Sequence, residues 1–89
     1  MNTERRHQPV FPGFREMAER RQALSEELVG LRRGLGLSQT EVAARMGTSQ
    51  SAVARLETGT ADVLVSTVER YVSALGCRLE WTLTEDDRS

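Results

Sequence analysis

Residues 38–59, SQTEVAARMGTSQSAVARLETG, constrain the fold of this 89-residue chain more than any other stretch. Ser38 and Glu41 follow the Ser-x-x-Glu pattern of a capping box, which begins a helix by satisfying two backbone N–H groups. Gly47 tolerates the positive φ that commonly ends a helix, so the first helix is predicted to stop there. A second helix of about two turns then ends at Gly59. The spacing therefore predicts two short helices joined by a tight turn.

This layout is that of a helix-turn-helix motif, whose second helix enters the major groove of DNA. Val53 and Leu56 of the second helix are predicted to face the core, after a cap at Thr48 or Ser49. The side chains left outward include no acid, and glutamine and arginine can bond adenine and guanine bidentately. We therefore predict a base-contacting set made of Ser49, Gln50, Ser51, Ala54 and Arg55.

Helical patterns flank the motif on both sides. Residues 14–35 carry leucines at spacings of four and three, which predicts one face of a helix. Ser25 is followed by two glutamates, so this stretch is either one helix or two helices with a break near residue 24. After the motif, Ser66 and Glu69 form a second capping box, and Gly76 ends the last predicted helix. The leucines of the first stretch are Leu24, Leu28, Leu31 and Leu35.

The segment GCRLEWTL, residues 76–83, alternates apolar and polar side chains, which predicts a strand with one buried face. No other stretch reads as a strand, and a single strand leaves its backbone donors and acceptors unpaired along both edges. The segment therefore needs a partner that the same copy of the chain does not supply. Its apolar positions are Cys77, Leu79, Trp81 and Leu83.

Charge and composition narrow the class of function. The formal charge is −1, but residues 28–60 carry four arginines against two glutamates, a mildly basic middle. Cys77 and His7 are the only cysteine and histidine, so neither an internal disulfide nor a metal site is expected. No arrangement of nucleophile and base appears, so we expect neither an enzyme nor a bound cofactor. RNA binding usually requires aromatic side chains on which bases can stack. The sequence lacks such a platform, so RNA binding is not expected.

Targeting signals are also missing from the sequence. No apolar run reaches membrane-spanning length, and the start of the chain has no apolar core of the kind found in signal peptides. A lone cysteine suits a reducing compartment. We expect a cytoplasmic protein with no membrane partner.

The stretch from Leu37 to Gly59 resembles the Cro/C1-type (XRE) helix-turn-helix family of bacterial and phage regulators. Over about residues 24–76, the resemblance implies an all-α, lambda-repressor-like domain of four to five helices that binds a palindromic operator in double-stranded DNA. It also implies an ion pair between Arg32 and Glu57. The positions that carry the resemblance are Gln39, Glu41, Ala43, Gly47, Gln50, Val53, Leu56, Glu57 and Gly59.

Phosphate contacts are expected at both ends of the motif. Ser38 and Gln39 lie at the start of the first helix, where backbone N–H groups also face outward. In the resembled family, the loop after the second helix often carries a cation that meets phosphate. Here that loop is Thr58-Gly59-Thr60, so Thr58 and Thr60 stand near the cation's position and no strong backbone clamp is expected.

The end of the chain resembles HigA-type and HipB-type antitoxins, in which one strand follows the last helix. In the HipB-like case the strand pairs with its mate, which implies that residues 77–84 form a two-stranded sheet between two copies of the chain. A twofold axis makes such a contact self-complementary. The dimer interface is expected at Cys77, Leu79, Trp81 and Leu83.

The two resemblances together imply a dimeric repressor that is the antitoxin of a toxin–antitoxin pair, with a toxin protein as a further partner. A stand-alone repressor of the same family, without a toxin, is the alternative. The expected organisation is a flexible arm over residues 1–13, a helix-turn-helix domain over 14–76, the dimerisation strand over 77–84 and an acidic tail over 85–89.

Overall fold

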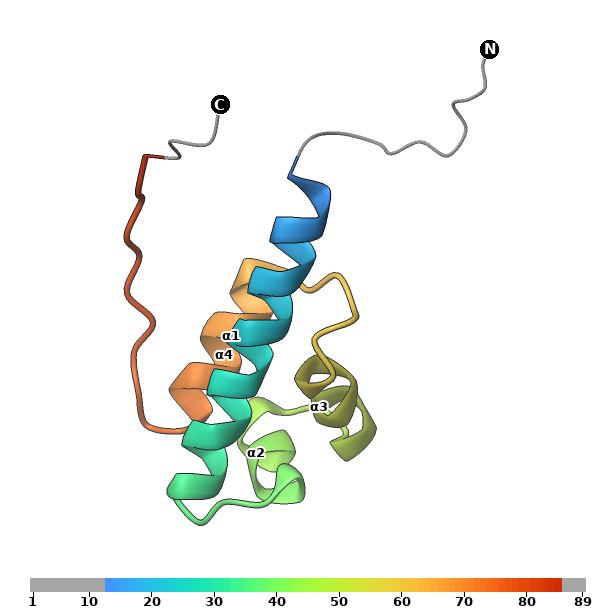
Figure 1. Cartoon of the computed structure of the whole chain (residues 1–89). Helices are drawn as coiled ribbons and strands as arrows, with labels where there is room; N and C mark the ends of the chain where they lie inside the picture. The colour runs from blue at the N-terminus through green and yellow to red at the C-terminus, as the bar shows by residue number, and fades with distance from the viewer. Residues whose placement is uncertain (1–12, 86–89) are drawn as a thin grey trace.

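The computed structural model describes residues 13–85, and four helices make up most of that part of the chain. They are α1 (Phe14–Gly34), α2 (Gln39–Met46), α3 (Gln50–Glu57) and α4 (Val65–Ala74). Figure 1 shows α1 and α4 side by side. α3 packs against α1 and α2, and α2 also packs against α4. The arrangement is the predicted all-α helix-turn-helix domain, with four helices in the described residues.

Residues 1–12 of the expected arm and residues 86–89 of the expected tail lie outside the described residues. Within residues 13–85, no helix is both long and apolar enough to cross a membrane.

α1 is one continuous helix, so the break considered near residue 24 does not occur. Ser25, which would have capped a second helix, is buried instead, and its Oγ donates a hydrogen bond to the Leu56 carbonyl at 3.4 Å. Of the leucine stripe, only Leu28 is buried. The 21-residue helix is much longer than the two short helices packed beside it, so the others keep 39–49 % of their surface: Leu24, Leu31 and Leu35.

The start of α2 has the predicted capping box. Ser38 Oγ accepts a hydrogen bond from the Glu41 N–H at 3.0 Å, and Glu41 Oε1 accepts one from the Ser38 N–H at 2.8 Å. The helix ends at Gly47, whose φ of 73° is the left-handed conformation predicted for that turn. Ser49, not Thr48, then caps α3, because its Oγ accepts from the Ala52 N–H at 3.1 Å.

The core lies where the helices of the motif meet α1 and α4. Ala43 of α2 is 3 % exposed, which is consistent with a close approach of α2 and α3 that only a small side chain permits. Val42 and Val53 are fully enclosed. The buried cluster consists of Leu28, Val42, Ala43, Val53, Leu56, Tyr71, Val72 and Leu75.

The second predicted capping box, Ser66 with Glu69, is wrong. α4 begins at Val65, its N-cap is Leu64, and no side chain caps it. Ser66 therefore lies inside the first turn with helical backbone, where its hydroxyl cannot reach the N–H that an N-cap residue would satisfy. The apolar positions of α4 fix which face of the helix is buried, and that burial does not depend on the cap.

Residues 77–85 contain no strand within this single chain. Figure 1 shows them as an extended segment that runs back along α1 and α4. Among the described residues, no main-chain hydrogen bond joins residues 78–85 to another part of the chain. A strand is defined by pairing, and this segment has no partner here, so the predicted strand and dimer sheet stay predictions.

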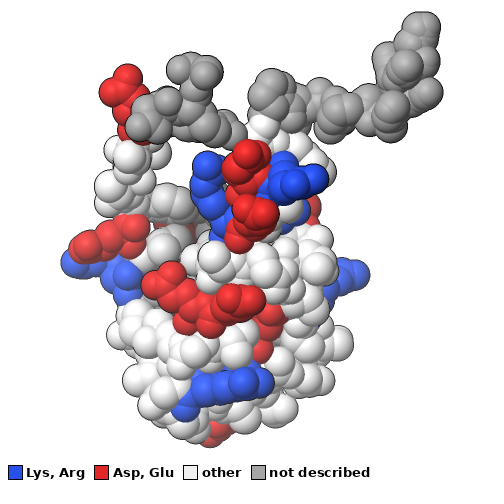
Figure 2. Space-filling view, in the orientation of Figure 1, with Lys and Arg blue, Asp and Glu red and all other residues white. Residues whose placement is uncertain are grey.

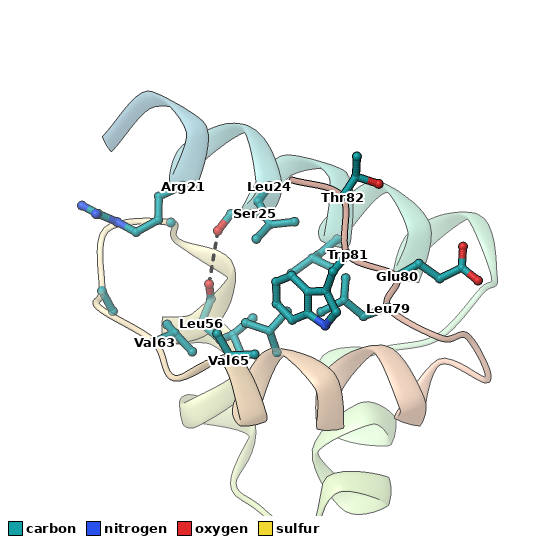
Figure 3. Close-up of a pocket in the computed structure, with 14 residues that line it drawn as sticks. Arg21, Leu24, Ser25, Leu56, Val63, Val65, Leu79, Glu80, Trp81 and Thr82 are labelled. Atoms are coloured by element: carbon teal, nitrogen blue, oxygen red, sulfur yellow. Dashed lines mark hydrogen bonds between the residues drawn. The ribbon is translucent and has the colours of Figure 1, made fainter. Parts of the chain in front are cut away.

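The apolar side chains of the C-terminal segment are only partly buried. A strand packed on the core of the same chain would bury all of them. Leu79 packs against the core cluster, whereas Trp81 is 59 % and Leu83 is 97 % exposed. Cys77 is also exposed, so the expectation of a buried cysteine fails for the single chain. Figure 3 shows Leu79 and Trp81 directed into an apolar groove between α1 and α4, with Leu24 and Val65 on its walls.

Gly59 is expected to resist substitution, because its φ is 75° and a Cβ there would lie 2.9 Å from Ser25 Oγ. Gly59→Ala should lower the free energy of unfolding by about 1–3 kcal/mol through backbone strain and overpacking. Gly30→Ala is the matched control, since Gly30 lies within α1 with no neighbour within 4 Å of the added methyl group. That change should stabilise the helix by about 0.5–1 kcal/mol. Urea unfolding measures both, and equal effects would contradict the assignment.

Candidate nucleic-acid interface

The outward face of α3 has the chemistry predicted for base contacts. Gln50, Ser51 and Arg55 are exposed, and Ala54 is half-buried. Ser49 caps the helix, and its Oγ lies 3.2 Å from Ser51 Oγ. Within the described residues, the Arg55 guanidinium makes no ion pair. The structure thus brings the five residues of the set together on one short helix, with a cation and two amide or hydroxyl groups open to a ligand.

Arg32 of α1 and Glu57 at the end of α3 are in direct contact. Arg32 Nε donates to Glu57 Oε2 at 2.7 Å, and Arg32 Nη2 donates to Glu57 Oε1 at 3.0 Å. Both side chains are nearly enclosed, with 8 % and 5 % of their surface exposed. Arg32 Nη1 also donates to the Leu37 carbonyl at 2.8 Å. This bidentate pair therefore ties α1 to the end of α3 and to the residue before the α2 cap.

Glu57 has two further donors. Tyr71 Oη, from α4, donates to Glu57 Oε2 at 2.6 Å, and Gln39 Nε2, from α2, donates to Glu57 Oε1 at 2.8 Å. The one carboxylate thus accepts four hydrogen bonds, and its partners come from three different helices. A buried charge is tolerated when its hydrogen-bonding capacity is filled in this way.

The carboxylate's surroundings shift its pKa and that of its neighbours. Burial acts to raise the pKa of Glu57, but the hydrogen bonds from Arg32, Tyr71 and Gln39 outweigh it, so the pKa lies below its ordinary value. Burial and then the Glu57 carboxylate raise the pKa of Tyr71, which keeps the phenol protonated as a donor. The hydrogen bond to Glu57 raises the pKa of Arg32. The cluster is therefore a fixed arrangement of one anion, one cation and one neutral hydroxyl.

Gln39 connects this buried cluster to the outward face of α3. Its Nε2 donates to Glu57, and its Oε1 accepts a hydrogen bond from Gln50 Nε2 at 2.6 Å. Gln39 is half-buried and Gln50 is exposed. Two hydrogen bonds in series thus join Glu57, in the core, to Gln50, a side chain that is open to a ligand.

The residues predicted to contact phosphate already make hydrogen bonds within the chain. Ser38 Oγ accepts a bond in the capping box but keeps its own hydrogen available to donate. Thr58 Oγ1 donates to the Arg55 carbonyl at 2.7 Å and lies 2.9 Å from Thr60 Oγ1. Since a hydroxyl has one hydrogen, Thr60 must be the donor to Thr58. Ser38 is therefore better placed than the two threonines to donate to a phosphate.

The surface charge is mixed. In Figure 2, acidic and basic side chains lie in small groups among uncharged residues, and neither sign dominates the visible face. This agrees with the formal charge of −1 for the whole chain. Long-range attraction of a polyanion to the chain as a whole is consequently weak.

The sequence alone does not predict the hydrogen-bond partners of three side chains in this region, Tyr71, Ser25 and Gln39. Tyr71 is fully buried in α4, and its hydroxyl donates to Glu57. Ser25 was weighed as a helix start and is a buried donor to α3. Gln39 was expected to bind phosphate, and no local pattern indicates its contact with Glu57. A buried hydroxyl or amide must find a partner, but the sequence does not say which one.

Comparisons with known proteins agree with this geometry. A family model described as Helix-turn-helix matches residues 31–82. Antitoxin HigA1 of Mycobacterium tuberculosis, in strain CDC 1551 / Oshkosh and in strain ATCC 25618 / H37Rv, is 43 % identical over 75 residues, or 84 % of this chain. The chain spans about half the length of these curated relatives, since the match covers 50 % of each. No solved structure matches.

Proposed function

The chain belongs to the helix-turn-helix family, and from that premise we propose that it is a dimeric, sequence-specific DNA-binding repressor. We propose further that it acts as the antitoxin of a toxin–antitoxin pair and represses the operon that encodes both. The observation that carries the proposal is the outward face of α3, which combines small side chains with Gln50 and Arg55 and carries no acid.

The chemistry of α3 supports base reading in the major groove. Gln50 and Arg55 can each make two hydrogen bonds to a base edge, to adenine and to guanine respectively. Ser49, Ser51 and Ala54 are small enough to let the helix approach the bases. These five residues are the proposed base contacts.

The start of α2 supports a phosphate contact. The backbone N–H groups of its first two residues, Gln39 and Thr40, have no backbone partner among the described residues, and Ser38 keeps a hydroxyl hydrogen. A helix N-terminus with free N–H groups favours an anion. Ser38 and Gln39 are the proposed main phosphate contacts, and Thr58 and Thr60 are weaker ones because their hydroxyl hydrogens are engaged.

Arg55→Ala is expected to cost about 1–3 kcal/mol of binding at one base pair and to relax the preference there. Gln50→Ala should do the same at a neighbouring base pair. The measurement is binding of each variant to a preferred duplex and to its single-base variants. Ser73→Ala, on the exposed side of α4, is the control. A uniform loss of affinity for all sequences would mean that these residues touch phosphate.

We propose that the dimer forms through residues 77–83, which pair antiparallel with the same segment of a second copy. The unpaired backbone of residues 78–85 supports this, because an edge of this kind readily accepts another strand. The exposed Trp81 and Leu83 support it too, since they offer apolar surface on the face that Leu79 continues. Two copies then present two α3 helices about 34 Å apart to successive major grooves of a palindrome.

The antitoxin assignment rests on the relatives, which are named as antitoxins and share 43 % identity with the chain. Because the chain spans about half of their length, the toxin partner is a proposal. The test is to express the chain together with the product of the adjacent reading frame. A stable complex and relief of growth arrest are expected. If the adjacent product neither binds the chain nor arrests growth, a stand-alone repressor is the better description.

A further inference from the structure

We propose that Glu57, a buried residue that does not face a ligand, is a positioning residue that makes Gln50 select adenine over guanine. The inference rests on the proposed reading of DNA by α3, and it assigns one feature of the specificity to a residue in the core. Glu57 has 5 % of its side-chain surface exposed, so it acts only through its neighbours.

The first step is the contact between Glu57 and Gln39. A carboxylate has no hydrogen to give and only accepts hydrogen bonds. The lowered pKa of Glu57 keeps it in that form. The side-chain amide of Gln39, 2.8 Å away, must therefore turn its NH₂ group toward Glu57, and its oxygen must point the other way. The reverse orientation would set the amide oxygen against a negative charge.

The second step is the contact between Gln39 and Gln50. The Gln39 oxygen can only accept, so Gln50 must turn its own NH₂ group toward it, as the 2.6 Å distance between Gln50 Nε2 and Gln39 Oε1 records. Gln50 is then left with its oxygen and its second N–H for an incoming base. The orientation of an exposed amide is thus fixed from the core by two hydrogen bonds in series.

The third step is the base edge. In the major groove, adenine offers the N6 amino donor beside the N7 acceptor, whereas guanine offers two acceptors, O6 and N7. An amide that presents one oxygen and one N–H matches adenine with two hydrogen bonds. Against guanine, the Gln50 oxygen would meet O6, and relief would require the amide to turn over and lose its bond to Gln39.

The relay is tested with Gln39→Met, which keeps the length of the side chain and removes both hydrogen bonds. The full chain and its variants each select duplexes from a randomised DNA library. Gln50→Ala first identifies the base pair that Gln50 reads. At that base pair, Gln39→Met should reduce the preference for adenine over guanine about two- to tenfold, the worth of one hydrogen bond. Preferences at other base pairs should not change.

Two further variants separate the relay from other effects. Thr40→Ala, at the next exposed position of α2, is the control and should leave the preference intact. Glu57→Asp withdraws the carboxylate from Gln39. In a variant that thermal unfolding shows to be folded, it should also reduce the preference for adenine over guanine at the same base pair. An unchanged preference in Gln39→Met overturns the relay. A change in Gln39→Met but not in folded Glu57→Asp overturns the assignment to Glu57. A wild-type chain that enriches no duplex overturns the proposed function itself.

Discussion

Leu83→Asp is expected to convert the chain to a monomer and to weaken binding to a palindromic duplex by about a hundredfold or more. Leu83 is 97 % exposed in the single chain, so the substitution removes no contact within one copy. In the proposed dimer the same position lies on the apolar face of the paired strands, where a buried carboxylate without a partner is costly. A monomer loses the gain in avidity that comes from linking two half-site contacts.

Light scattering and duplex binding measure the two effects of Leu83→Asp. Thr84→Asp is the matched control, because it adds the same charge one residue away, on the opposite face of the alternating segment. That variant should remain dimeric. A truncation after Gly76 should behave like Leu83→Asp, with an added loss of stability because Leu79 packs on the core. If Leu83→Asp stays dimeric with unchanged affinity, residues 77–83 do not form the dimer contact.

Arg32→Ala and Glu57→Ala are each expected to lower the free energy of unfolding by about 3–5 kcal/mol, because each leaves a buried charge without its partner. For a domain of this size, that is a large share of the total stability. The double variant should cost clearly less than the sum of the two, since both charges are then gone. Urea unfolding measures the cycle, and strict additivity would mean that the two residues do not stabilise each other.

The pH dependence of stability is a second readout of the same pair. The pKa of Glu57 is lower in the folded chain than its ordinary value of 4.5, so the ionised carboxylate contributes stability above that value. The contribution is lost as the pH falls below about 4.5 and through the folded pKa. The wild-type chain should therefore lose stability more steeply in this acid range than a folded Glu57→Gln variant does.

The helix-turn-helix could be predicted from the sequence because its signals are local. A cap such as Ser38 with Glu41 lies within one turn of helix, and the turn at Gly47 depends on one backbone conformation. Helical periodicity also predicts which side chains of α3 face outward, because Val53 and Leu56 face the core. Interactions between neighbours along the chain are visible to a pattern in the chain.

The hydrogen bonds of the buried polar side chains could not be predicted in full, because the partners are far apart in the sequence. Tyr71 reaches Glu57 across 14 residues, and Ser25 reaches Leu56 across 31. Helical periodicity favours a buried Tyr71 but does not name the partner of its hydroxyl, and no local pattern indicates that Ser25 is buried. Ser66 shows the opposite error: the local capping pattern is present, but α4 begins at Val65, two residues before the start that a cap at Ser66 predicts. For the C-terminal segment, the alternating pattern separates an apolar face from a polar face. It does not name the strand partner, because the proposed partner lies in another copy of the chain.

Footprinting on the DNA upstream of the chain's own reading frame is the direct test of the proposed dimeric repressor. We expect a protected palindrome whose two halves are centred about one helical turn apart. We also expect Arg55→Ala and Gln50→Ala to abolish protection at concentrations where the wild-type chain protects fully. Protection that lacks twofold symmetry, or that persists unchanged in both variants, would contradict the proposal.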